Sequence, residues 1–246
     1  MDENRPTSAD ALALRRRGRL QEAVEAYSKL YEFDGRPPSL SGRGRTYLLM
    51  GNYAAALADF EQAIAIEAPN FLGDSQFLSL GVAHWFLNQP THSIAAWQRG
   101  LNTPYTDAAG GVELPALLLY GAVRLRDALL EKKAIKLLEQ FATDEKKAWP
   151  GSIAPFLLGK IDTQELLSNI KASKSDILRA RFQCQADFFI GLRAYIKSDK
   201  RTFQEAMIRC SENYYGDLHH EYYLAHWEVK RNFPEPAFPP AATRSS

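Results

Sequence analysis

The apolar residues of this chain recur at helical spacing over most of its length, in paired segments separated by a short turn. Around Gly51 the sequence reads GRTYLLMGNYAAALADFEQAIAI. In the second segment of this stretch, Ala56, Phe60 and Ala63 are spaced by four and three residues, so they lie on one face of a helix. The pattern predicts a helix, a Gly-Asn turn and a second helix that runs back along the first.

The same plan occurs three times in the first part of the chain. Upstream, ADALALRRRGRLQEAVEAYSKL places its turn at Gly18, which is 33 residues before Gly51. Downstream, GVAHWFLNQPTHSIAAWQRGL is offset by 37 residues, and the extra residues fall in the loop at 69–75. A repeat period of about 34 residues indicates a helical repeat protein, in which each hairpin buries its apolar face against the next.

These segments resemble the tetratricopeptide repeat (TPR), a helix–turn–helix unit of about 34 residues. The second copy carries the small and aromatic residues of that repeat in register, at Gly44, Tyr47, Tyr53, Ala56, Phe60 and Ala63. The resemblance implies stacked hairpins that form a right-handed superhelix, with the first helix of each hairpin lining a concave groove. We therefore expect an all-α TPR helical-hairpin solenoid of about four to five repeats with a C-terminal capping helix.

Changes in composition along the chain divide this solenoid into parts. We expect three TPR repeats over 4–107, followed by a degenerate helical hairpin over 114–148. A Trp-Pro connecting segment with a short helix should occupy 149–174, and a TPR-like repeat with a capping helix should follow over 175–232. The last segment, 233–246, is rich in proline, and we expect it to be disordered.

The C-terminal half shows a second, narrower resemblance, to the NlpI family of bacterial TPR adaptors. It rests on the order of motifs between Trp149 and Val229: a Trp-Pro pair, then FLLGKI and ELL, then HEYYLAHWEV. The resemblance implies a docking scaffold, and members of that family are lipid-anchored in the periplasm. The first cysteine of this chain is Cys184, so it lacks a lipobox. We expect a cytoplasmic protein, and a periplasmic one only if the sequence is a trimmed form.

Composition and charge remove several classes of function. The 30 basic and 29 acidic side chains nearly balance, which argues against a nucleic-acid-binding protein. The chain contains no apolar run of about 18 residues, so we expect no membrane insertion. Two cysteines are too few for a disulfide scaffold, although Cys184 and Cys210 fall at the same end of one predicted hairpin. A role for Cys210 as a small buried hydrophobe is favoured over a disulfide.

No pattern of catalytic residues stands out. The chain has no glycine-rich phosphate loop, no nucleophile elbow and no paired carboxylates at a recognisable spacing. The densest group of metal-ligand types is His219, His220 and His226 with Glu221, but it has no HExxH motif and no histidine pair at i,i+4. We therefore expect no metal, no cofactor and no catalytic residue, and the chain is predicted not to be an enzyme.

The concave groove is the predicted working surface. The groove-facing positions of the first three repeats combine apolar anchors with arginines, a mixture that suits a partner peptide or helix. The predicted partner-binding residues are Leu12, Arg16, Arg45, Leu49, Leu78, Trp85 and Phe86. Within this set, Arg45 is expected to face solvent and to pair with an acidic group of the partner.

The sequence thus predicts a non-enzymatic adaptor or scaffold that holds a partner protein in its groove. The alternative is an immunity or inhibitor protein that neutralises a specific enzyme or toxin through the same groove. The first repeat has little chain before it to cover its apolar residues, Leu12, Leu14 and Leu20. Because the ends of a solenoid need a cap, we also expect a homodimer contact there.

Overall fold

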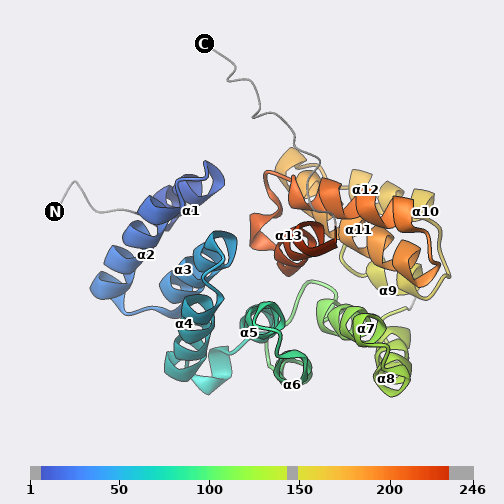
Figure 1. Cartoon of the computed structure of the whole chain (residues 1–246), viewed down its shortest axis with the longest axis horizontal. Helices are drawn as coiled ribbons and strands as arrows, with labels where there is room; N and C mark the ends of the chain where they lie inside the picture. The colour runs from blue at the N-terminus through green and yellow to red at the C-terminus, as the bar shows by residue number, and fades with distance from the viewer. Residues whose placement is uncertain (1–6, 143–148, 233–246) are drawn as a thin grey trace, which may run out of the picture.

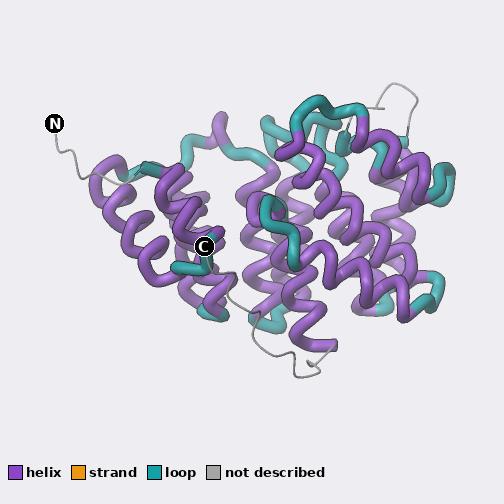
Figure 2. Tube along the Cα trace, turned by 90° about the horizontal axis from the view of Figure 1, so that it is seen from above, coloured by secondary structure: helices purple, strands orange, loops and turns teal. Residues whose placement is uncertain are grey.

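The structure is a computed structural model that describes residues 7–142 and 149–232 of the 246-residue chain. Within these residues the regular elements are thirteen α-helices, α1 to α13, and two short 3₁₀ helices, η1 and η2. The predicted all-α class and the arrangement in helical hairpins are confirmed (Figures 1 and 2). The predicted disordered tail at 233–246 lies outside the described residues.

The N-terminal part consists of three hairpins and the loop helix η1. They are α1 (Ser8–Arg16) with α2 (Leu20–Asp34), α3 (Pro37–Met50) with α4 (Tyr53–Ile66), and, after η1 (Pro69–Phe71), α5 (Asp74–Phe86) with α6 (Pro90–Gly100). In the second hairpin, two residues of the sequence, Gly51 and Asn52, form the turn. Gly51 ends α3 with a left-handed φ of 78°, and the side chain of Asn52 accepts a hydrogen bond from the backbone N–H of Ala55 to begin α4.

The C-terminal part contains two further hairpins, two short connecting helices, the 3₁₀ helix η2 and a final helix. In chain order they are α7 (Glu113–Leu125), α8 (Ala128–Glu139), α9 (Ile153–Leu157), α10 (Thr163–Lys171), α11 (Asp176–Ile196), α12 (Lys200–Ser211), η2 (Gly216–Leu218) and α13 (His220–Asn232). The turns of the two hairpins use Arg126 and Ser198 in the left-handed conformation, where the first two hairpins use glycine.

Small residues allow the two helices of a hairpin to approach closely. A Cβ atom added to Gly81 would lie 2.1 Å from the Nε1 atom of Trp97, and one added to Gly44 would lie 2.7 Å from the ring of Phe60. Gly191 meets Met207 in the same way in the α11–α12 hairpin. The glycines of the repeat pattern are therefore positions where an aromatic or long side chain of the partner helix fills the space of the missing Cβ.

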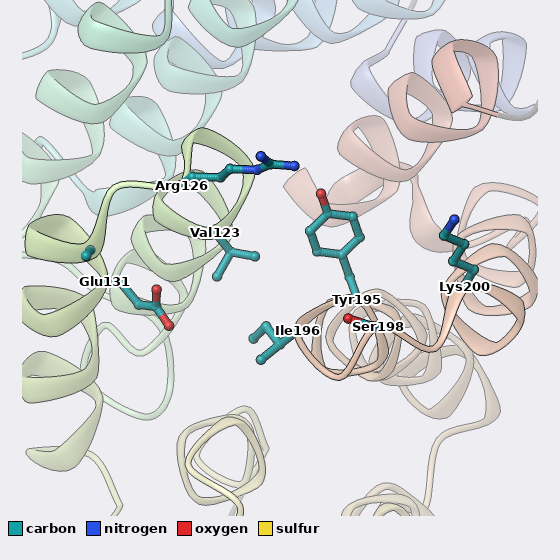
Figure 3. Close-up of a pocket in the computed structure, with 8 residues that line it drawn as sticks. Val123, Arg126, Glu131, Tyr195, Ile196, Ser198 and Lys200 are labelled. Carbon is teal, nitrogen blue, oxygen red and sulfur yellow. The ribbon is translucent and has the colours of Figure 1, made fainter.

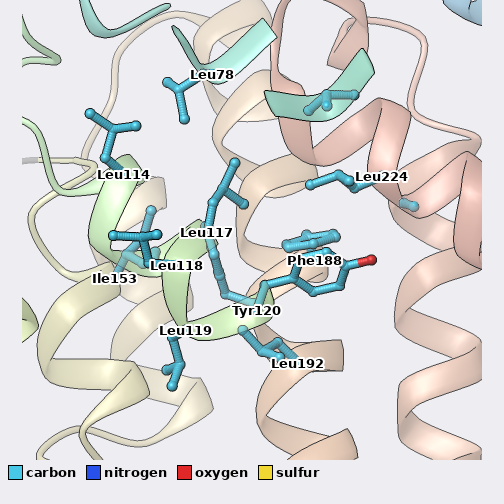
Figure 4. Close-up of a cluster of buried hydrophobic side chains, with 14 of the residues drawn as sticks. Leu78, Leu114, Leu117, Leu118, Leu119, Tyr120, Ile153, Phe188, Leu192 and Leu224 are labelled. Atoms are coloured by element: carbon cyan, nitrogen blue, oxygen red, sulfur yellow. The ribbon is translucent and has the colours of Figure 1, made fainter. Parts of the chain in front are cut away.

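The main hydrophobic core runs through the hairpins from α3 to α13. Figure 4 shows its centre, where Leu117 and Tyr120 of α7 face Phe188 of α11 and Leu224 of α13. The first hairpin has a smaller core of its own, formed by Ala11, Ala26, Tyr27 and Leu30. Cys184 and Cys210 are buried thiols in the α11–α12 hairpin, with their Sγ atoms 3.3 Å apart.

The chain curves so that α13 lies between its two halves. Figure 1 shows α13 between the N-terminal hairpins and α11, and α13 contacts α5 as well as α11 and α12. The last described helix therefore does more than cap the preceding repeat, because it also packs on the third hairpin. None of the described helices is both long enough and apolar enough to cross a membrane.

Candidate partner-binding groove

The concave side of the N-terminal hairpins holds the chain's own segment of η2 and α13. Its polar contact is made by Asp217, which accepts hydrogen bonds from Arg15 Nη2 at 2.8 Å and from Arg16 Nε at 2.9 Å. Arg15 is only 3% exposed and also donates to the backbone carbonyl oxygens of Asp217 and Gly42. A buried arginine pair of this kind is well placed to fix the position of η2 against α1 and α3.

The apolar contact is aromatic. The ring of Trp227 in α13 stacks on Phe86 of α5, with centroids 6.2 Å apart and an interplanar angle of 2°. The same indole meets Trp85 edge to face at 6.2 Å, and Tyr53 of α4 packs against Phe86 at 5.0 Å. Aromatic pairs at these separations stabilise a contact beyond the area that they bury. The groove residues Trp85 and Phe86 thus bind a helix of their own chain.

Arg45 is not the solvent-facing arginine that the sequence predicted. Its Nε atom is buried and has no hydrogen-bond partner, and Tyr27 and Tyr223 are among its electrostatic neighbours. Burial lowers the pKa of the Arg45 guanidinium, and the charge of Arg15 lowers it further. The expectation failed because it assumed an empty groove, whereas η2 and α13 cover this part of α3.

The structure places the other predicted groove residues in two groups. Leu78 and Trp85, 1% and 6% exposed, belong to the core of the chain. Two cavities remain beside the segment that fills the groove, one of about 300 Å³ and one of about 350 Å³. The first is lined by Arg16, Leu49 and Phe86 together with Leu48, Tyr53, Tyr222, Trp227 and Lys230. The second is lined by Leu12 and Arg45 together with Tyr27, Pro38, Gln76 and Leu218.

Sequence reasoning missed the contribution of α13 to this surface. It treated HEYYLAHWEV as part of a capping helix, whose outer face should be polar. Three aromatic residues in that helix, Tyr222, Tyr223 and Trp227, were a signal that both of its faces are covered. Tyr223 is 1% exposed, and Trp227 lines the first cavity.

A further cavity, of about 560 Å³, lies away from the groove, between the turn of the α7–α8 hairpin and that of the α11–α12 hairpin (Figure 3). Its charged side chains are Arg126, Glu131 and Lys200, and its apolar wall includes Val123 and Tyr195. The sequence did not predict it. Its charges have mixed sign, and its walls bring together no set of nucleophile, acid and base that would indicate catalysis.

A buried polar cluster lies where α7, α11 and the start of α13 meet. It contains Glu113, Gln185, His219, His220 and Glu221, and it lies beside the second cavity, with which His220 is connected through Ser79 at 3.0 Å. Burial raises the pKa of Glu221 to about 7 and lowers that of His219 to about 3. His219, His220 and Glu221 stood out in the sequence, but Glu113 did not, because it is the first residue of α7 and lies far from them along the chain.

Comparison with known proteins identifies one repeat directly. A family model described as tetratricopeptide repeat matches residues 38–70, which span almost all of the α3–α4 hairpin and η1. Among solved structures, the chain is similar to YrrB, described as a TPR protein with an unusual peptide-binding site. The two share 17% sequence identity over 90% of this chain and 89% of that one, with a TM-score of 0.42. The molecule is thus an all-helical hairpin protein that contains a tetratricopeptide repeat.

Proposed function

We propose that this protein is a non-enzymatic adaptor that binds a partner protein on the concave face of its N-terminal hairpins. The observation that carries the proposal is the intramolecular contact itself. The groove already holds the η2–α13 segment, by stacking Phe86 on Trp227 of α13 and by pairing Arg15 and Arg16 with Asp217 of η2. A surface that recognises a helix by an aromatic anchor and a buried carboxylate has the chemistry of a helix-in-groove binding site.

The partner contact is proposed to centre on the cavity of about 300 Å³ between α3, α5 and α13. Its floor is apolar, with Leu49, Tyr53 and Phe86, while Arg16 and Lys230 supply positive charge at its edge. This combination favours a short peptide or helix that presents one large apolar side chain and a nearby carboxylate. The same surface would serve an adaptor of the kind that the NlpI-like resemblance of the C-terminal half suggests.

A substitution at Leu49 tests this site without removing a charge from the interior. Leu49 is partly buried and lines the cavity, so Leu49→Asp should weaken partner binding at least tenfold by placing a carboxylate in an apolar pocket. The partner would first be captured with the full-length protein and identified by mass spectrometry, and its affinity then measured by calorimetry with the purified variants. Arg45→Glu is unsuitable because Arg45 is half-buried and its Nε atom is enclosed without a partner, so the change would disturb packing as well as binding.

Lys132→Glu is the control, since Lys132 is exposed on α8, a helix that Figure 1 shows well apart from the N-terminal hairpins. Equal affinity of wild type and Leu49→Asp, with both folded by circular dichroism, would place the binding surface elsewhere. The experiment also separates the two roles considered from the sequence. A captured enzyme that loses its activity when bound would make this protein an inhibitor, and several partners that keep their activities would support a scaffold.

Self-association is a separate proposal, based on the apolar residues of the first hairpin. Leu12, Leu14 and Leu20 are partly buried within the chain, and each leaves some apolar surface to solvent. We propose a homodimer contact over this hairpin. Light scattering at tens of micromolar should then give about twice the chain mass of 27.7 kDa, and a value at 27.7 kDa would refute the dimer.

A further inference from the structure

The buried polar cluster brings together side chains that commonly bind metal ions. Glu113 is the first residue of α7, His219 precedes α13, and Glu221 lies in the first turn of α13. One potential ligand atom from each of these three residues lies within 4.8 Å of the other two. The three donors therefore surround one small space, although Glu113 is separated from the other two by most of the C-terminal half of the chain.

Gln185 of α11 holds the two carboxylates in place. Its side chain is buried, and its Oε1 atom accepts a hydrogen bond from Trp149 Nε1 at 2.8 Å. The amide nitrogen of Gln185 consequently points the other way, where it donates to Glu113 Oε1 at 2.5 Å and approaches Glu221 Oε1 at 3.4 Å. Gln185 therefore places one oxygen of each carboxylate beside the same amide group, and it makes no hydrogen bond to the second oxygen of either one.

The second oxygen of Glu221 lacks the partner that a buried carboxylate needs. Glu221 is fully buried, and its Oε2 atom has no hydrogen-bond partner. The Nδ1 atom of His220 is also buried without a partner, at 4.0 Å from Glu113 Oε2. In the described part of the chain, neither Glu113 nor Glu221 forms an ion pair with a lysine or arginine. A buried, unpaired carboxylate is costly unless a cation or a proton neutralises it.

The remaining neighbours leave this need in place. Asp107 lies close enough to interact electrostatically with Glu113, but its own oxygens accept the backbone N–H groups of Ala109, Gly111 and Glu113. Arg181 donates to Nε2 of His219 at 3.3 Å, and its charge also acts on Glu113 without forming an ion pair.

We propose that Glu113, His219 and Glu221 form a binding site for one divalent transition-metal ion, with zinc as the expected ion. Two carboxylates and a neutral imidazole are hard and borderline donors of the kind that zinc accepts, and their two negative charges match the charge of the ion. His220, with its free Nδ1 atom beside Glu113, is available as a further ligand. An ion bound there would fasten the start of α13 to α7, and so fix the helix that fills the groove.

Zinc binding to the full-length protein tests the proposal. Calorimetric titration with zinc chloride should give one ion per chain, and zinc should raise the melting temperature above that measured with a chelator. Glu221→Gln should reduce zinc affinity at least a hundredfold. In the presence of chelator this variant should melt at the wild-type temperature or higher, because a neutral amide replaces an unpartnered carboxylate. Cobalt(II) should show visible absorption bands of a four- or five-coordinate site in the wild type and lose them in Glu221→Gln.

His92→Gln is the matched control. His84 and His92 stack with ring centroids 5.3 Å apart on the α5–α6 hairpin, so they are the place where an adventitious zinc ion would meet two adjacent imidazoles. The proposal requires His92→Gln to keep the stoichiometric site. Loss of zinc binding in His92→Gln with retention in Glu221→Gln, or no binding by the wild type, would overturn it. Should Glu221→Gln fail to fold, Glu113→Gln provides the same measurement at a side chain that is 13% exposed. None of these outcomes alters the result of the Leu49→Asp experiment.

Discussion

At the scale of single residues, close helix contacts depend on the absence of side-chain atoms. Ala56 is fully buried in α4, opposite the helix that carries Gly44, and Gly81 leaves room for the indole of Trp97. Such positions tolerate added volume poorly, because the surrounding side chains are already close-packed. The small residues of the repeat pattern therefore mark the positions where two helix backbones come close. Because these positions recur at fixed spacing, the helix contacts can be predicted from the sequence.

Ala56→Leu should test this interpretation of the small residues. The three added carbon atoms must overpack the interface between α3 and α4, so the variant should lose about 1–3 kcal/mol of unfolding free energy. Ala58→Leu is the matched control, since the same change falls on an exposed position of the same helix. Chemical denaturation of both variants measures the difference. Equal stabilities would mean that Ala56 is not at a close contact.

At the scale of elements, α13 combines features of a core helix and of a bound ligand. One side packs on α11 and α12, and the other carries Trp227 and His226 to the groove. The Nε2 atom of His226 is buried without a partner, and its ring meets Tyr222 edge to face at 4.6 Å. Burial, and to a smaller degree the charge of Lys230, lowers the pKa of His226 to about 4.

The stability of this docked helix should therefore depend on pH through His226. In the unfolded chain the histidine takes up its proton near pH 6.5, whereas in the folded chain it does so only near pH 4. The stabilising contribution is present above pH 6.5 and is lost as the pH falls toward 4. Between pH 7 and pH 5 the wild type should lose about 1–2 kcal/mol more than His226→Phe. Urea denaturation at the two pH values gives this difference, and parallel losses would contradict it.

At the scale of the whole molecule, contacts between the two ends of the described chain close the curve of hairpins. Arg15 and Asp217 are 202 residues apart in sequence, yet they form a buried ion pair. In the interior a buried pair of this kind is worth less than its geometry suggests, because both ions lose their hydration. Removing only one partner strongly destabilises the fold, since the remaining charge stays buried and unpaired.

Asp217→Ala should therefore open the closed arrangement. Arg15 would be left without its carboxylate partner, at a cost of about 3–5 kcal/mol, and the first hairpin should separate from η2. Small-angle X-ray scattering should then show a larger radius of gyration than for the wild type. Glu22→Ala breaks only the exposed pair between Arg19 and Glu22, and should leave the scattering unchanged. A wild-type scattering curve for Asp217→Ala would show that other contacts are sufficient for closure.

The individual hairpins can be predicted from sequence, whereas the packing of distant helices against one another cannot. Hairpins depend on residues a few turns apart, so the spacing of Ala56, Phe60 and Ala63 was enough to predict the helical class and the repeat that matches the family model. Periodicity does not specify which distant surface covers a helix face. For that reason the partial burial of Arg45, and the meeting of Glu113 with His219 and Glu221, could not be predicted.

The filling of the groove by α13 has a consequence for the order of events during synthesis. The third hairpin ends at Gly100, and the helix that covers its Trp85 and Phe86 starts at His220. Translation at 5–20 residues per second separates the two by about 6–24 s. During that interval the nascent chain presents an aromatic groove with no helix in it. The exposed aromatic groove should then bind other proteins most readily. A molecular chaperone or the partner itself has its best opportunity to bind before α13 is made and covers the groove.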